Sequence, residues 1–245
     1  MAFLTRLSRS ESKQATQIQE IFMKNKLTRS EASEKLKNKI IDVSIELFNK
    51  YGYRETTTRQ IVKKAGITTG SLYHFFKDKE DILLHTTLLV YKQAMDAADV
   101  IADNFLGNKD DTALRYAIIY ALEMKAVESY ERVAELYLET YSSWRITEVM
   151  MNMNVERNKT FFSRYNPDLT DEEYYIRTLA LRGMRLAFLN ERVHHGKIDY
   201  EKKCAFLIET GLSTFNVPIN KTASIASRAI SLTREDRFNI QGYNV

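Results

Sequence analysis

Small polar side chains gather in one stretch within the first third of the chain. Thr69 and Ser71 carry hydroxyl groups that can hydrogen-bond to nucleic-acid base edges or to phosphate oxygens, and Gly70 between them lets another backbone approach closely. Tyr73 and His74 follow, and both can donate to a phosphate. These residue types, next to the free amides of a helix start, predict contact with a polyanion.

Two short helices are expected to position these groups. Thr57 and Gln60 form a capping box, which starts a helix that runs to Ala65. Thr68 caps a second helix of about six residues, and Gly66 is the turn residue between the two. Two short helices joined by a three-residue link that contains glycine are typical of a helix-turn-helix.

A longer helix is predicted on each side of this pair. Residues 34–51 repeat apolar side chains at three- and four-residue spacing, and Gly52 ends that helix. Asp78 caps a helix that runs from Lys79 towards Phe105 and stops near Gly107. The region therefore has the three-helix organisation that a helix-turn-helix requires.

The stretch from about residue 35 to residue 85, a fifth of the chain, resembles the DNA-binding domain of the TetR family of transcriptional regulators. Many residues at fixed spacing carry the resemblance, among them Ile40, Leu47-Phe48, Gly52-Tyr53, Thr57, Ile61, Ala65-Gly66-Ile67-Thr68, Gly70-Ser71-Leu72-Tyr73, Phe76 and Lys79-Glu80. His74 precedes Phe75 where the family usually has an aromatic residue followed by His, which leaves the role of His74 open. The resemblance implies a repressor that dimerises through its last two long helices and releases DNA when it binds a ligand.

Charge is distributed unevenly along the chain. Residues 1–92 hold 17 Lys and Arg against 10 Asp and Glu, whereas residues 93–245 hold 19 against 22. This asymmetry favours a polyanion partner for the first part alone. Packing of Tyr73 or simple solvation of Lys79 is the alternative for each of those residues. The predicted DNA-binding residues are Thr57, Arg59, Thr68, Thr69, Gly70, Ser71, Tyr73, His74 and Lys79.

The rest of the chain also has helical spacing. Because no segment alternates apolar and polar residues, we predict an all-α fold, with a three-helix helix-turn-helix domain followed by a larger helical domain. The later helices are expected over 112–128, 131–145, 148–164, 171–194 and 200–216, with a short one over 222–231. The predicted division is a polar, partly disordered extension (1–33), a DNA-binding domain (34–80), a ligand-sensing and dimerisation domain (81–217) and a C-terminal extension without an assigned role (218–245).

Tyrosine and methionine are frequent between Tyr116 and Phe162, and such side chains suit either a pocket for apolar ligands or an ordinary helical core. The predicted ligand-binding residues are Tyr116, Tyr120, Met124, Tyr137, Tyr141, Trp144 and Met151. Arg182 and Arg185 lie at i, i+3 spacing. We interpret them as surface ion-pair residues, with binding of a carboxylate ligand as the alternative.

The last two long helices carry apolar and glycine residues that suit close helix packing between two copies of the chain, although packing within one chain is the alternative. The predicted dimer interface is Leu179, Gly183, Leu186, Cys204, Ile208, Gly211, Leu212 and Phe215. The expected partners are thus a near-palindromic double-stranded operator, a small apolar or amphipathic molecule and a second copy.

Other functions find less support in the sequence. Glu191, His194 and His195 could bind a metal in an enzyme, but their spacing matches no recognised zinc motif. No catalytic residue, metal or cofactor is therefore predicted. The single cysteine and the lack of a signal-like or membrane-spanning apolar run favour the cytoplasm. An activator, or a repressor that needs no ligand, remains a second hypothesis.

Overall fold

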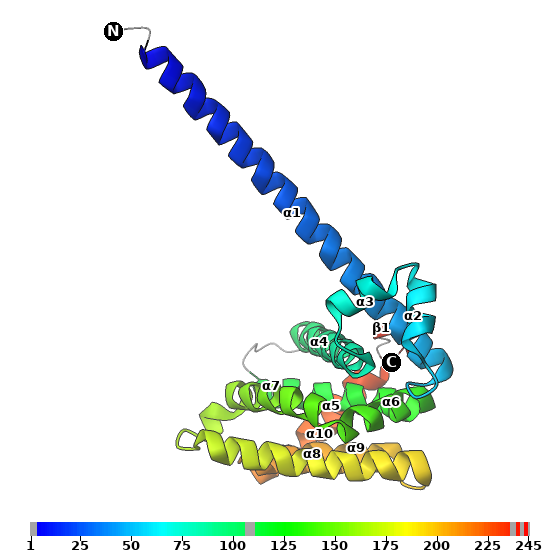
Figure 1. The fold of residues 1–245 in the computed structure, drawn as a ribbon. Coiled ribbons are helices and arrows are strands. Elements are labelled where there is room, and N and C mark those ends of the chain that lie inside the picture. Colours follow the sequence, from blue (N-terminus) through cyan, green and yellow to red (C-terminus); the bar gives the residue numbers. More distant parts are fainter. Residues whose placement is uncertain (1–3, 106–110, 236–238, 241–242, 245) are drawn as a thin grey trace.

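The structure, a computed structural model, describes residues 4–105, 111–235, 239–240 and 243–244, with side chains described for 28–104 and 111–234 (Figure 1). This part of the chain is almost entirely helical, which confirms the predicted all-α class. Two short antiparallel strands, β1 (Asn239–Ile240) and β2 (Tyr243–Asn244), are the exception within the described residues. No helix among these residues is both long and apolar enough to cross a membrane.

The helices follow one another with short connections. In chain order they are α1 (Leu4–Tyr51), α2 (Thr58–Ala65), α3 (Thr69–Phe75), α4 (Lys79–Phe105), α5 (Thr112–Ser129), α6 (Glu131–Ser142), α7 (Trp144–Phe162), the 3₁₀ turn η1 (Ser163–Tyr165), α8 (Asp171–His194), α9 (Tyr200–Thr214) and α10 (Ile219–Glu235). The predicted starts of α2 to α6, α8 and α9 agree with these bounds, and capping residues mark most of them in the sequence. Helices α7 and α10 begin four and three residues earlier than predicted. The stop predicted near Gly107 lies outside the described residues.

The prediction of a partly disordered arm over residues 1–33 is wrong for the described part. Residues 4–33 instead continue α1, whose N-terminal half projects from the rest of the molecule in Figure 1. No proline or glycine occurs between residues 4 and 51, so nothing in the backbone interrupts the helix. Polar composition alone was therefore a poor guide to order in this segment.

Helices α1 to α4 form a small unit around one apolar cluster. Ile40 and Phe48 of α1 pack against Ile61 of α2, Leu72 of α3 and Ile82 of α4, and all five side chains are buried. Ile146 at the start of α7 belongs to the same cluster. The helix-turn-helix is therefore packed directly onto the larger helical unit.

The larger unit is built around α5, which is buried along most of its length. Tyr116 of α5, Phe162 of α7 and Phe215 after α9 form an aromatic cluster in which the Phe162 and Phe215 rings stack at 4.7 Å. Helix α10 packs against α5 and α9 and contributes Ala226 and Ala229 to the same core. The final segment, which had no predicted role, thus closes one side of this core.

The apolar stripe predicted as a dimer interface on α9 lies inside the chain. Cys204, Ile208, Leu212 and Phe215 are fully buried against neighbouring helices, and Gly211 is buried with them. The prediction for these five residues is wrong, because helical spacing identifies an apolar face without showing which surface covers it. Burial also raises the pKa of the Cys204 thiol to about 12.

Gly211 allows α9 to approach α5 closely. A Cβ atom at this position would meet the Tyr116 hydroxyl and would lie 3.0 Å from two ring carbons of that residue. Gly211→Ala is therefore expected to lower the free energy of unfolding by about 1–3 kcal/mol, measured by urea denaturation. Because the hydroxyl is the nearest obstacle, Tyr116→Phe should recover part of this loss in a double-mutant cycle. Equal stability of wild type and Gly211→Ala would contradict the packing.

Candidate nucleic-acid interface and ligand cavity

Three of the predicted DNA-binding hydroxyl groups hold the starts of α2 and α3. The Thr57 side chain accepts from the Gln60 amide at 3.3 Å, and the Gln60 side chain accepts from the Thr57 amide at 2.7 Å. Thr68 Oγ1 accepts from the Ser71 amide at 3.1 Å and lies 2.8 Å from the Ser71 hydroxyl. Gly66 takes the left-handed conformation at the end of α2, with φ of 65°. These contacts fix the geometry of the turn between the two helices.

The remaining predicted residues of α2 and α3 form an exposed surface. Thr69, Gly70, Tyr73 and His74 of α3 are exposed, as is Arg59 at the start of α2. The Tyr73 side chain, half of which is accessible, does not pack in the domain core. The surface therefore presents a hydroxyl, a phenol, an imidazole and a guanidinium to any partner that meets α3.

Lys79 was predicted to contact DNA, but in the structure its side chain binds backbone carbonyls of the same chain. Its ammonium donates to the carbonyls of Tyr53 and Thr56 at 2.9 Å and of Arg54 at 3.3 Å, and it lies 4.3 Å from the Tyr53 ring centroid. Burial lowers the pKa of this ammonium. Because its three N–H groups all point at carbonyls, we correct the prediction: Lys79 ties the loop before α2 to the start of α4.

A cavity of about 80 Å³ lies between the two units. That volume is several times the roughly 10–15 Å³ that one water molecule needs. Its walls come from α1, α4, α5, α6, α7 and α8, and they are mostly apolar. Among the lining side chains are Ile45, Glu123, Tyr137, Tyr141, Ile146, Arg182 and Arg185.

The cavity has a small polar side. Arg182 is 8% exposed and donates to Thr147 Oγ1 at 2.5 Å and to the Tyr141 carbonyl at 3.2 Å. Arg185 lies 3.7 Å from Glu123. Burial raises the pKa values of Tyr137 and Tyr141, so both phenols keep their protons near neutral pH and can donate hydrogen bonds.

The predicted ligand-binding residues divide into two groups. Tyr137 and Tyr141 line the cavity. Tyr116, Tyr120, Met124 and Met151 belong to the core instead, and Trp144 is 70% exposed, so none of these five lines this cavity. Residue type could not separate pocket from core, because both use tyrosine and methionine.

The two arginines were interpreted as surface residues, and that interpretation is also wrong. Both line the cavity, although surface pairing is the usual role of arginines on a long helix. The sequence did contain a signal for this position. Arg182 and Arg185 are spaced with the apolar residues Leu181 and Leu189 so that all four lie near the inward face of α8.

The metal hypothesis gains no geometric support. The described residues contain no group of three or more His, Cys, Asp or Glu that could hold an ion. The Glu191 carboxylate accepts from the Lys197 and Ile198 amides and from the buried Lys203 ammonium. Glu191 therefore closes the turn after α8.

The fold and this site together define a helix-turn-helix protein with a cavity-bearing helical domain. Residues 40–86 match the family described as "Bacterial regulatory proteins, tetR family". The helix-turn-helix segment of the chain is therefore similar to that of the tetR family of bacterial regulatory proteins, and curated HTH-type transcriptional regulators also match the chain.

Among these, the uncharacterized HTH-type transcriptional regulator YerO of Bacillus subtilis (strain 168) is 26% identical over 71% of this chain and 62% of its own length. The HTH-type transcriptional regulator QacR of Staphylococcus aureus is 51% identical over 20% of this chain and 26% of its own. The alignments thus span less than two thirds of either relative.

Solved structures share the fold over most of the chain. The structure of RolR in complex with resorcinol has a TM-score of 0.58 at 18% identity and covers 81% of this chain and 96% of its own. SmeT, the repressor of the Stenotrophomonas maltophilia multidrug efflux pump SmeDEF, has a TM-score of 0.53 at 17% identity and covers 72% of this chain and 88% of its own.

The exposed surface of α3 generates a prediction that separates two kinds of contact. Tyr73→Phe removes the exposed hydroxyl that we predict to donate to phosphate, so binding should weaken about tenfold for every duplex. Thr69→Val should instead change the preferred sequence, because base contacts carry specificity. Fluorescence anisotropy on a panel of duplexes measures both effects. A uniform effect of Thr69→Val, or a sequence-dependent one of Tyr73→Phe, would contradict the assignment.

Proposed function

We propose that this protein is a ligand-responsive transcriptional regulator, and that it is a repressor that leaves its operator when a small apolar or amphipathic molecule enters the cavity. Residues 34–80 act as the DNA-binding domain and residues 81–217 as the sensing and dimerisation domain. The DNA-binding residues are the predicted set without Lys79. Residues 40–86 match a family of bacterial regulatory proteins, which supports the DNA-binding half.

The observation that carries the proposal is that the cavity touches both units. Ile45 of α1 and Ile146 of α7 line the cavity and also belong to the apolar cluster of the helix-turn-helix. A molecule that fills the cavity therefore acts directly on the packing of the DNA-binding domain. A ligand shifts the equilibrium between two states only through its different affinity for each.

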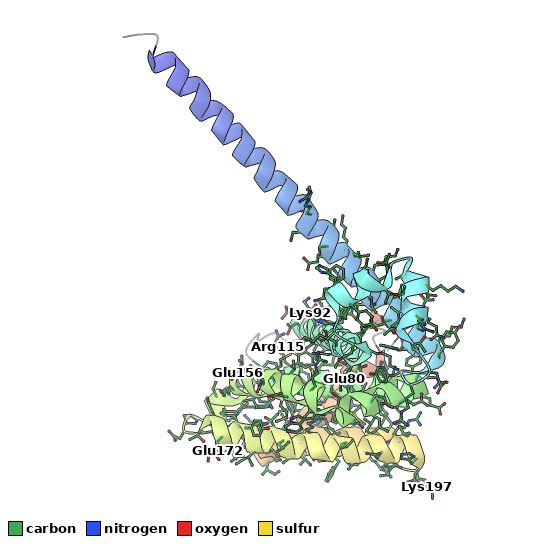
Figure 2. All side chains as sticks on the ribbon, viewed as in Figure 1. Glu80, Lys92, Arg115, Glu156, Glu172 and Lys197 are labelled. Atoms are coloured by element: carbon green, nitrogen blue, oxygen red, sulfur yellow. The ribbon has the colours of Figure 1, made fainter. Side chains whose placement is uncertain are left out.

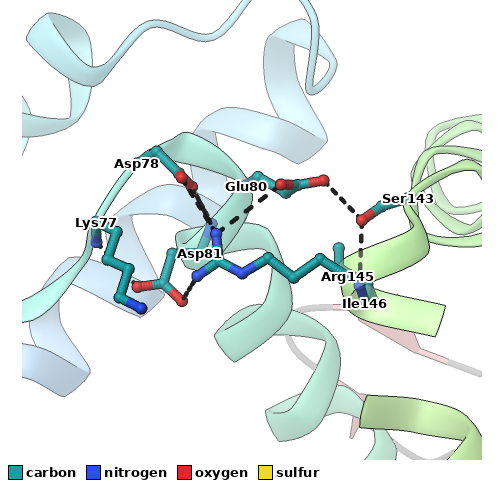
Figure 3. Close-up of polar contacts among 7 residues, drawn as sticks. All are labelled: Lys77, Asp78, Glu80, Asp81, Ser143, Arg145 and Ile146. Atoms are coloured by element: carbon teal, nitrogen blue, oxygen red, sulfur yellow. Dashed lines mark hydrogen bonds and ion pairs between the residues drawn. The ribbon is translucent and has the colours of Figure 1, made fainter. Parts of the chain in front are cut away.

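Polar contacts at the junction of α6 and α7 support the same coupling (Figure 3). Arg145 lies 3.1 Å from Asp78, 2.7 Å from Asp81 and 3.9 Å from Glu80, at the start of α4. The Ser143 hydroxyl donates to Glu80 at 2.7 Å. Because α3 is followed directly by α4, these contacts link the sensing unit to the helix that meets DNA.

The same junction is joined to the cavity. Thr147 donates to the Ser143 carbonyl at 2.6 Å and accepts from Arg182 at 2.5 Å. A shift of Arg182 in the cavity therefore moves the segment that holds the acidic start of α4. This route supplements the long helix α4, which we predict to act as a lever between the two units.

Arg145→Met tests the coupling. An effector found by thermal-shift screening of amphipathic compounds should weaken operator binding by wild type roughly 5- to 150-fold. The variant should bind the effector about as tightly, but the effector should weaken its operator binding by a clearly smaller factor, because the junction no longer holds the start of α4. Operator titrations with and without effector measure this factor.

Arg115→Met is the matched control, since Arg115 also bridges two acids of α4, Asp99 and Asp103, but at the other end of the helix. Figure 2 labels Arg115, and it labels Glu80 in the first turn of α4. In the control variant, the effector should weaken operator binding by the same factor as in wild type. Loss of response in both variants, or in neither, would count against the junction. A compound that binds wild type tightly without changing operator affinity would indicate a ligand-independent regulator.

We further propose that the regulator is a dimer formed through the exposed side of α8 and α9. Leu179 and Ile176 of α8 are 43% and 56% exposed, and Phe206 of α9 is 58% exposed. The Phe206 ring lies 6.0 Å from the Phe188 ring across the two helices. Gly183 is exposed on the same helix, which permits close helix approach. Of the predicted interface, Leu179, Gly183 and the half-buried Leu186 therefore remain.

Phe206→Asp should convert a dimer into monomers, because it places an unpaired charge in the contact, and operator affinity should fall with it. Sedimentation equilibrium at micromolar concentration measures the state. Val100→Asp is the control, since Val100 is 53% exposed on α4 and lies outside α8 and α9. A monomeric wild type, or a dimeric Phe206→Asp variant, would refute this interface.

A further inference from the structure

The cavity contains positive charge that the chain does not fully balance. Within the described part of the chain, no carboxylate lies within ion-pair distance of Arg182, whose partners are a carbonyl, a hydroxyl and the Tyr141 ring at 4.0 Å. Burial lowers the pKa of Arg182, and Arg185 lowers it further by repulsion. A guanidinium nevertheless stays protonated in proteins. The Arg182 charge is thus buried with neutral hydrogen-bond partners and no counterion, which is costly.

The other charges near the cavity do not cancel this one. Glu123 is the single carboxylate among the described residues of the cavity wall, and it faces Arg185. The Nε atom of Arg185 and the Oδ1 atom of Asn154 are buried without a hydrogen-bond partner. Arg157 lies behind the wall, over the Tyr91 ring at 5.5 Å, and donates to the Tyr120 hydroxyl. The polar side of the cavity therefore has excess positive charge and an unused buried donor.

We infer that the molecule bound in this cavity is an amphipathic anion whose acidic headgroup binds Arg182 and Arg185 while its apolar body packs against α4 and α6. This inference rests on the proposed function and specifies its effector. A carboxylate between the two guanidinium groups supplies the missing counterion and accepts from the free Nε. Val90, Ala94, Val133 and Leu136 offer the apolar surface for the body.

Matched compounds separate the headgroup from the body. Two series share one tail each: octanoate, 1-octanol and octylamine, and 4-phenylbutyrate, 4-phenylbutanol and 4-phenylbutylamine. Isothermal titration on the full chain should find at least one carboxylate bound roughly 10- to 100-fold more tightly than its alcohol, because hydrogen bonds to charged groups are the stronger ones. The amines should bind most weakly, since they add positive charge beside the arginines.

Variants assign the effect to the two arginines. Arg182→Met and Arg185→Met should each lower carboxylate affinity towards that of the alcohol and leave alcohol affinity unchanged, which also shows that the cavity is intact. Arg182→Lys keeps the charge and should retain part of the preference. Arg177→Met, on the same helix but outside the cavity wall, should behave as wild type.

Several outcomes would overturn the inference: in both series an alcohol or amine that binds as tightly as its carboxylate, a carboxylate preference that survives both methionine substitutions, or no binding by any member of either series. Operator titration distinguishes its failure from that of the proposed function. If 1-octanol releases the operator and octanoate does not, the proposed ligand response is supported and the inference of an anionic effector is wrong. If octanoate binds through Arg182 and leaves operator affinity unchanged, the anion site is supported and the proposed ligand response is wrong.

Discussion

Three carboxylates stand within four residues at the start of α4, and their mutual repulsion must be balanced for the helix-turn-helix to be held in place. Part of the balance is local, because Asp78 accepts from the Asp81 amide at 2.6 Å and negative charge is favourable at a helix N-terminus. The rest comes from Arg145, which reaches them from α7. Arg145 thus helps to set the position of α3 relative to the sensing unit. The DNA-binding and ligand-binding halves are therefore joined by charge as well as by apolar packing.

Local signals in the sequence were sufficient for most of the helices and for the starts that a capping residue marks. The capping box at Thr57 and the cap at Thr68 are both present where the residue types predicted them. Such contacts depend on neighbours within three residues, so one sequence contains the whole of the information. The continuous helix α1 was missed because polar composition was given more weight than the absence of helix breakers.

The same reasoning could not predict which residues pack in the core, which stay exposed and which line the cavity. The apolar stripe around Ile208 on α9 is buried in the core, whereas the apolar residue Leu179 on α8 is exposed. Both fit the same helical spacing, so the spacing could not tell them apart. Lys79 has the residue type of a phosphate ligand but lies where three carbonyls converge. Arg182 looked like a surface residue because no spacing rule reports the cavity that α4 and α6 form in front of it. In each case the deciding neighbour lies far away in the chain.

The core position of Cys204 has a consequence for how the protein can sense its surroundings. The chain has a single cysteine, which is fully buried, and its thiol has a pKa of about 12. Thiolate, the form that reacts with peroxide or with a disulfide, is therefore scarce at neutral pH and shielded from both reagents. With one cysteine the folded chain has no second thiol to form an internal disulfide. Oxidants thus cannot switch the folded chain by joining two of its own cysteines.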